Sequence, residues 1–106
     1  MAWLYLILAG ILEIGWAIGL RYTEGFTRLW PSLGTIAVMV LSFLCLSQAI
    51  KALPIGLAYT VWTGIGAVGT VLVAHWLLGE TLSLMGLVFV AIIIVGILGL
   101  KLVSPH

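Results

Sequence analysis

One acidic residue stands alone in a long apolar stretch: Glu13 is the only charged residue between about residues 2 and 20. If this stretch crosses a membrane, an ionised side chain at its centre costs roughly 2.5–3.5 kcal/mol. The apolar stretches of the chain hold no Lys or Arg at that depth. We therefore expect Glu13 to be the functional centre, exchanging protons or holding a cation from outside. The alternative is a protonated structural glutamic acid that bonds between helices.

The neighbours of Glu13 would extend this chemistry if the stretch is helical. Gly10, Trp16 and Ala17 share its helix face because they lie three or four residues away. The small residues allow close helix approach or leave space for a ligand. Trp16 offers a π face and an N–H donor beside the carboxylate, although it could equally serve packing alone.

A second group of polar and aromatic residues lies farther along the chain. Tyr59, Trp62 and Gly66 fall on one helix face. Aromatic rings attract cations by about 0.5–2 kcal/mol, so Tyr59 and Trp62 are candidate ligands, with ordinary interhelical packing as the alternative. The Ser42 hydroxyl could bond Glu13 or a ligand, or its own helix. Gly64 and Gly66 together could form a hinge, or simply pack closely.

Other kinds of chemistry have no support in the sequence. We find no metal-ligand cluster, no Gly-rich phosphate loop and no nucleophile paired with a base. The basic residues do not cluster, as nucleic-acid binding would require, and the net charge is only +1. The sequence therefore predicts no metal, no cofactor, no nucleic-acid partner and no enzymatic activity.

The elements that must position these residues follow from composition. Of the 106 residues, 64% are hydrophobic and 7% charged, with a mean hydropathy of +1.38, whereas soluble domains carry about 25% charged residues. Apolar stretches run over about residues 2–20, 30–50, 54–78 and 82–100. Each approaches the roughly 20 residues that cross a bilayer as a helix. We predict an all-α membrane protein, with residues 1–106 forming one domain of four transmembrane helices in a lipid bilayer.

The loops give no bias in orientation. Lys51 and Lys101 lie on one predicted side of the membrane, and Arg21 and Arg28 on the other. Since Lys and Arg counts set orientation, the tie leaves open whether the chain inserts both ways or in one fixed way. Four short helices leave little room for an aqueous path, so transport would most naturally need at least two copies.

These features resemble the small multidrug resistance family of proton-coupled exporters, over essentially the whole chain. The resemblance rests on three segments: Glu13, Glu24-Gly-Phe-Thr-Arg-Leu-Trp-Pro31 and Gly56-Leu-Ala-Tyr-Thr-Val-Trp-Thr-Gly-Ile-Gly66. It implies an antiparallel, dual-topology homodimer in the bacterial plasma membrane. It also implies that Glu13 binds proton and cation in turn, that Tyr59 and Trp62 line the site, and that a kink falls on Gly64 and Gly66.

Within the family, the segment Glu13-Ile-Gly-Trp16-Ala resembles the guanidinium exporters. Multidrug members typically lack this Trp and tend to carry an aromatic residue where this chain has Met39. The resemblance implies proton-coupled export of guanidinium-type cations. Gly96 matches a glycine that packs the dimer, although Phe89 stands where multidrug members often have Gly. The resemblance further implies that the glutamates are organised by Gly10, Trp16, Ser42 and Trp62.

Three other functions remain open from the sequence. The nearest is a polyspecific exporter of quaternary ammonium and other lipophilic cations, which Trp16 beside Glu13 disfavours. A small dual-topology ion channel would show flux without proton coupling. Half of a lipid-carrier flippase, or a structural partner of a larger complex, would show no transport alone.

Overall fold

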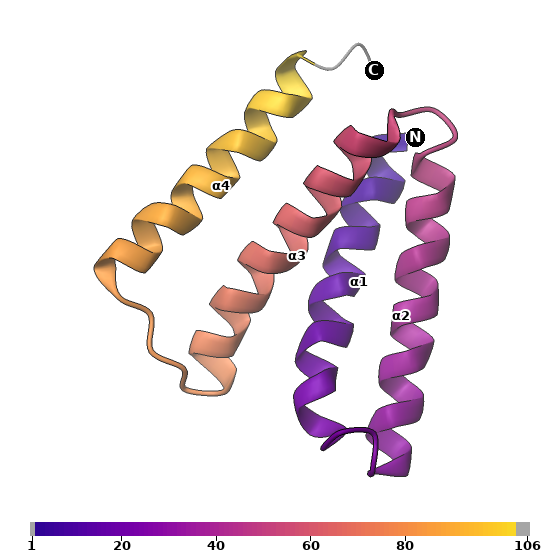
Figure 1. The fold of residues 1–106 in the computed structure, drawn as a ribbon, viewed down its shortest axis with the longest axis vertical. Helices are drawn as coiled ribbons and strands as arrows, with labels where there is room; N and C mark the ends of the chain where they lie inside the picture. Colours follow the sequence, from indigo (N-terminus) through magenta and orange to yellow (C-terminus); the bar gives the residue numbers. More distant parts are fainter. Residues whose placement is uncertain (1, 104–106) are drawn as a thin grey trace.

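The computed structural model describes residues 2–103, which form four α-helices joined by short loops (Figure 1). Each helix is long enough and apolar enough to cross a membrane, which confirms the prediction of four membrane-spanning helices. Two of them extend past their expected ends at about residues 20 and 100. The helices are α1 (Ala2–Tyr22), α2 (Leu29–Ala49), α3 (Ile55–Leu77) and α4 (Leu84–Val103).

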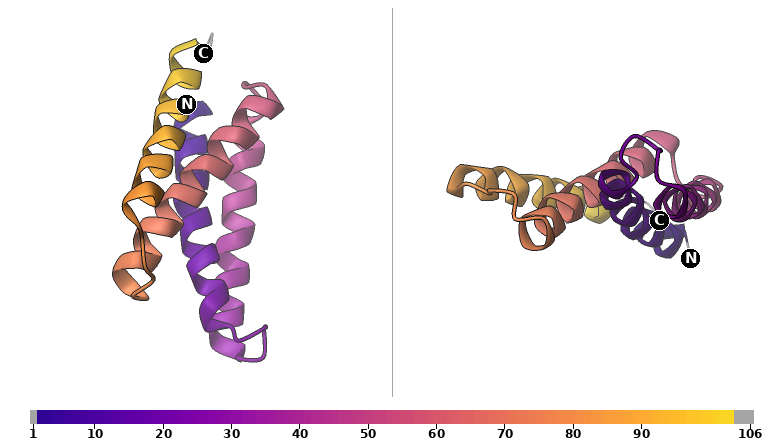
Figure 2. Two further views of the ribbon diagram at one scale, coloured as in Figure 1. Left: turned by 60° about the vertical axis from the view of Figure 1, so that its left-hand side comes forward. Right: turned by 90° about the horizontal axis from the view of Figure 1, so that it is seen from below.

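Consecutive helices run in opposite directions, so α1 and α3 run the same way (Figure 1). The loop between α2 and α3 lies at the end of the molecule where α1 begins and α4 finishes, and the other two loops lie at the opposite end. The backbone of α1 packs against α2 and α3, whereas within residues 2–103 that of α4 approaches α3 alone. The result is a slab of 43 × 35 × 17 Å rather than a closed bundle (Figure 2).

The buried core belongs to the first three helices and the loop between α2 and α3. No residue of α4 is buried, and Ile97 and Leu100 only pack against the edge of the core. The fourth helix is therefore peripheral in a single chain. The core residues are Leu6, Ala9, Ala49, Leu53, Ala58, Val61 and Trp62.

Glycines mark the places where helices meet most closely. A Cβ atom on Gly10 would lie 2.6 Å from Cγ2 of Ile65, and one on Gly64 would lie 2.8 Å from Cδ1 of Ile97. Both distances are too short for a real contact, so these positions admit only glycine without rearrangement. Helix α3 continues unbroken through this region. Gly64 thus serves as a contact surface for α4 in this conformation, and a hinge role for it stays a prediction.

An ion pair joins the end of α1 to the loop between α3 and α4. Nη1 of Arg21, at the end of α1, lies 3.4 Å from Oε2 of Glu80 in the loop after α3. The backbone carbonyl of Glu80 also lies 2.7 Å from Nδ1 of His75. Both charged side chains are exposed, so the pair adds little stability; it shows only that the loop after α3 lies beside the end of α1.

Candidate functional site

Glu13 lies in the middle of α1, with its carboxyl group against Gly66 of α3. A Cβ atom on Gly66 would overlap the carboxyl carbon and Oε1 of Glu13. Oε1 is buried and has no hydrogen-bond partner among the described residues. Within residues 2–103 the one ion pair joins Arg21 and Glu80, so no basic side chain neutralises Glu13. The carboxyl group therefore keeps unused capacity to bind a proton or a donor.

A hydrogen-bonded triangle ties three helices together next to Glu13. The Ser42 hydroxyl of α2 donates to the Ala9 carbonyl of α1 at 2.8 Å. Nε1 of Trp62, on α3, donates to Oγ of Ser42 at 3.1 Å and to the Ala9 carbonyl at 3.2 Å. In an α-helix the carbonyl of residue 9 also accepts the amide of residue 13. Ser42 and Trp62 therefore fix the turn of α1 that carries Glu13.

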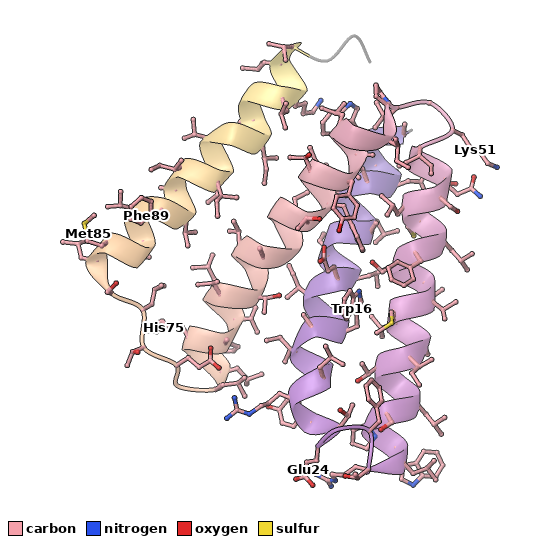
Figure 3. The ribbon with its side chains drawn as sticks, in the orientation of Figure 1. Trp16, Glu24, Lys51, His75, Met85 and Phe89 are labelled. Atoms are coloured by element: carbon pink, nitrogen blue, oxygen red, sulfur yellow. The ribbon has the colours of Figure 1, made fainter. Side chains whose placement is uncertain are left out.

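Four aromatic rings form a continuous row across the same three helices. The rings of Trp16 and Phe43 lie edge to face with centroids 6.3 Å apart. The Phe43 ring lies 5.7 Å from that of Trp62, which lies 5.5 Å from that of Tyr59. Trp16 reaches toward α2 from α1 (Figure 3), and its buried Nε1 has no acceptor among the described residues. Trp16 follows Glu13 by about one helical turn on α1, so the row brings π faces, and an N–H donor without an acceptor among the described residues, to the turn beside the carboxyl group.

The structure gathers most of the predicted site residues, although their side chains differ in exposure. Trp62 is 6% exposed and Ser42 is fully buried, so the polar groups of both side chains face other protein atoms. Tyr59 is 57% exposed, which leaves its ring and hydroxyl accessible. Gly10 packs against Ile65, one turn before Glu13. The predicted residues thus include the buried Ser42 and Trp62, which support the turn of Glu13, and Tyr59, whose ring is accessible.

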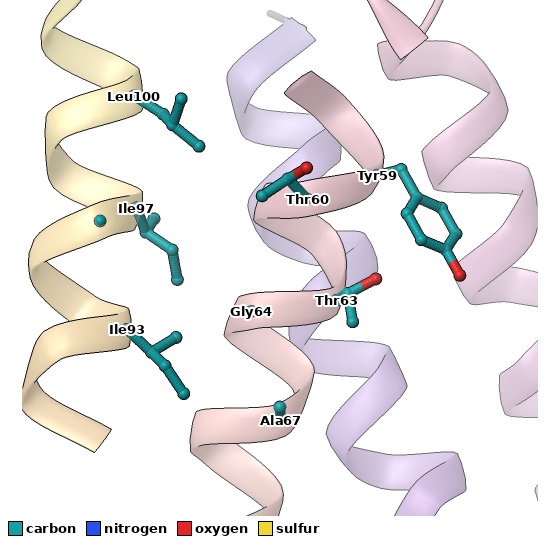
Figure 4. Close-up of a pocket in the computed structure, with 9 residues that line it drawn as sticks. Tyr59, Thr60, Thr63, Gly64, Ala67, Ile93, Ile97 and Leu100 are labelled. Atoms are coloured by element: carbon teal, nitrogen blue, oxygen red, sulfur yellow. The ribbon is translucent and has the colours of Figure 1, made fainter. Parts of the chain in front are cut away.

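Gly96 lies apart from this group. It lines a cavity of about 750 Å³ between α3 and α4, into which Ile93 and Ile97 extend from α4 (Figure 4). The lining contains no charged residue, and its polar groups include the hydroxyls of Thr60 and Thr63. Glu13 is not part of the lining but Tyr59 is, so this cavity reaches the row of aromatic rings without reaching the carboxyl group. Nothing lies within 4 Å of a Cβ atom placed on Gly96, so the position leaves space on α4.

Sequence reasoning missed Phe43, which links Trp16 to Trp62. The available signal was an aromatic residue directly after Ser42 in the middle of the second apolar stretch. Its partners come from different helices, however, so its role depends on how α2 is rotated against α1 and α3. A single sequence does not define that rotation.

The arrangement suits reversible binding better than covalent chemistry. A half-buried carboxyl group without a basic partner can take up a proton, or a cation that brings its own N–H donors. Nearby aromatic rings favour weakly hydrated, delocalised cations. Among residues 2–103, no three His, Cys, Asp or Glu side chains lie close enough together to hold a metal ion.

Comparison with known proteins agrees with this architecture. Residues 1–93 match the family described as Small Multidrug Resistance protein. Proteins named guanidinium exporter from Citrobacter freundii and Salmonella typhimurium are each 55% identical over 106 residues, which is the full length of both chains. The protein of that name from Escherichia coli K12 is 52% identical over the same length. The chain therefore belongs to the small multidrug resistance family and is a multi-pass transporter of the bacterial plasma membrane, not an enzyme.

Proposed function

We propose that this protein is a proton-coupled antiporter that exports guanidinium and small substituted guanidinium cations from the cytoplasm. The observation that carries the proposal is the position of Glu13 in the middle of α1, where it is the only acidic residue within any of the four helices. Its buried Oε1 has no partner among the described residues. Full-length relatives named guanidinium exporters, 52% and 55% identical to this chain, support the choice of substrate.

The chemistry of guanidinium matches the groups around Glu13. The cation is planar and can give a carboxylate two parallel N–H···O bonds. It is also more weakly hydrated than an ammonium ion, so less hydration is lost when it enters an aromatic-lined site. We propose that Glu13, Trp16 and Tyr59 contact the cation. Trp62 supplies part of the aromatic wall, and with Ser42 it holds the turn that bears Glu13.

We further propose that the working unit is an antiparallel homodimer with dual topology. The helices place Lys51 and Lys101 at one end of the molecule and Arg21 and Arg28 at the other, so positive charge gives no preferred orientation. In a single chain α4 buries no residue, and the slab does not enclose the carboxylate. A second copy would cover these surfaces and bring two Glu13 residues to one site.

In the proposed cycle, protons and guanidinium compete for the two Glu13 carboxylates. On the outside the carboxylates take protons and release the cation, and on the inside they lose protons and bind it again. Two buried like charges without a counter-ion are costly, so the empty, deprotonated transporter rarely changes sides. This restriction couples the two fluxes.

The number of protons exchanged decides how the membrane potential contributes. If both carboxylates release protons when one cation binds, one net charge moves per cycle, and the potential adds about 2.3 kcal/mol per 100 mV. A one-for-one exchange would be electroneutral. We expect the two-proton version, and an electroneutral reversal potential would overturn it.

The test of the proposed function is proton movement driven by a guanidinium gradient in liposomes that contain only this protein. We expect coupled flux of guanidinium, weak flux of tetra-alkyl ammonium ions, and no coupled flux in a Glu13→Gln variant. Strong flux of bulky ammonium ions would instead indicate a polyspecific exporter. Guanidinium flux without proton movement would indicate a channel, and no flux of any cation would contradict self-sufficient transport.

A further inference from the structure

Thr70, in the second half of α3, has a hydroxyl group that the structure leaves unused. Its Oγ1 is buried and has no hydrogen-bond partner among the described residues. Threonines in membrane helices commonly bond the carbonyl four residues earlier, as Thr60 of the same helix does with Gly56 at 2.8 Å. For Thr70 that acceptor would be the Gly66 carbonyl, yet the bond is not made. A free hydroxyl in apolar surroundings is unfavourable, so a partner outside its own helix backbone is expected.

The register between α1 and α3 indicates a candidate partner, with which no hydrogen bond is made in this structure. Glu13 lies against Gly66, and Ile14 lies against Gly69. Because the two helices are packed together and run in the same direction (Figures 1 and 2), one further turn on each places Ala17 opposite Thr70. Helical side chains lean toward the preceding turn, so Thr70 leans toward the turn of Gly66, where the Glu13 carboxyl group lies.

We propose that Thr70 is a positioning residue of the carboxylate site. In this structure its hydroxyl group and Oε1 of Glu13 both lack a partner, and a rotation of either side chain lets the hydroxyl group hydrogen-bond Glu13 and fix the plane of its carboxyl group. This inference rests on the proposed function. A hydroxyl group both donates and accepts, so the contact serves both states of the cycle. It donates to the ionised carboxylate that holds guanidinium, and it accepts from the protonated carboxyl group after the cation has left.

The benefit is geometric, because guanidinium is planar and its paired hydrogen bonds need a carboxylate of fixed orientation. Glu13 has no basic partner within residues 2–103 that could hold it in place. A bond from Thr70 to one oxygen restrains the rotation of the group and leaves the other lone pairs for the cation. Without that bond, guanidinium must itself order the carboxylate when it binds.

The test compares variants at Thr70 that separate the hydroxyl group from side-chain shape. Thr70→Val keeps the shape and removes the hydroxyl, whereas Thr70→Ser keeps the hydroxyl and removes a methyl group. Hydrogen bonds to charged groups correspond to about a tenfold or larger effect on binding. We expect the KM for guanidinium in liposomes to rise about tenfold in Thr70→Val, and that of Thr70→Ser to stay within about twofold of wild type.

Thr60→Val is the matched control, since the Thr60 hydroxyl bonds its own helix, and we expect it to behave as wild type. If Thr70→Val does not fold, Thr70→Ala and Thr70→Ser differ by a single oxygen atom and give the same comparison. The role of Thr70 would be overturned, and the proposed function left standing, by either of two results. One is a wild-type KM in the variants without a hydroxyl group; the other is an impaired Thr70→Ser beside an unimpaired Thr70→Val. A wild-type protein that fails to move guanidinium would overturn the proposed function, and the role of Thr70 with it.

Discussion

The carboxyl group of Glu13 occupies the space that a Cβ atom on Gly66 would fill. The Glu13 carboxyl group therefore packs directly against the backbone of α3 at a position without a side chain, and it faces a neighbouring helix instead of lipid. Any side chain at residue 66 would push it out. The position of the proposed proton and cation site thus depends on a residue that has no functional group of its own.

Gly66→Ala is expected to abolish most transport while leaving the helix intact. Alanine favours helix more than glycine does, but its methyl group would displace the Glu13 carboxyl group. A displacement of about 1 Å can cost an active site about a hundredfold, so we expect guanidinium flux to fall by at least about tenfold. Gly34→Ala is the control because nothing lies within 4 Å of a Cβ atom there. Wild-type flux in Gly66→Ala would show that Glu13 works from another position.

Ser42→Ala is expected to destabilise the protein. The change removes the bond to the Ala9 carbonyl and leaves Nε1 of Trp62 with one acceptor instead of two. Loss of buried hydrogen bonds costs about 1–3 kcal/mol, which a lower unfolding midpoint in detergent would report. Ser47→Ala removes a hydroxyl group that bonds Leu44 on the exposed side of α2 and should change little. Equal midpoints for the two variants would contradict a supporting role for Ser42.

Phe43→Leu is expected to weaken guanidinium binding without unfolding the protein. The ring joins Trp16 to Trp62, and its loss leaves both indole rings less constrained. Aromatic contacts with cations contribute about 0.5–2 kcal/mol, so the Kd should rise by about two- to thirtyfold. Phe89→Leu on α4 serves as the control, because Phe89 is 58% exposed and has no aromatic partner in the described part of the chain. Titration calorimetry in detergent measures both, and an equal change in the two variants would exclude a specific effect.

A single added positive charge is expected to bias the orientation of the chain. Glu24→Lys raises the count of Lys and Arg at its end of the molecule above that of Lys51 and Lys101 at the other end. Since positive charge favours the cytoplasm, a reporter fused after the last helix should shift to the outside. Glu24→Gln removes the acid without adding a positive charge and should leave the reporter on both sides. A wild-type reporter found on one side only would contradict dual topology.

The four helices could be predicted because bilayer thickness imposes a length on every apolar stretch. The outward position of α4 could not be predicted from the sequence. Its residues are apolar on every face, so no stripe of polarity indicates which side meets a neighbour. The structure shows that α4 meets α3 with Ile93 and Ile97 at Gly64, that Leu100 packs against the edge of the core, and that none of its residues is buried.

The candidate site was predicted only in part for a similar reason. Glu13 is conspicuous because an acid in an apolar helix is costly wherever its neighbours lie. The contact of the Glu13 carboxyl group with Gly66, and the contact of the Phe43 ring with Trp16, depend on the register and rotation between helices. Spacing within one helix carries no information about either.

The most direct test of the central claim, that proton and guanidinium share Glu13, is proton release by the purified protein. We expect guanidinium to acidify a weakly buffered solution of the wild-type protein. The release should fade as the pH is raised, because Glu13 is then already ionised before the cation arrives. The Glu13→Gln variant should neither bind guanidinium nor release protons. Guanidinium binding without proton release at any pH, or release that persists in Glu13→Gln, would contradict the claim.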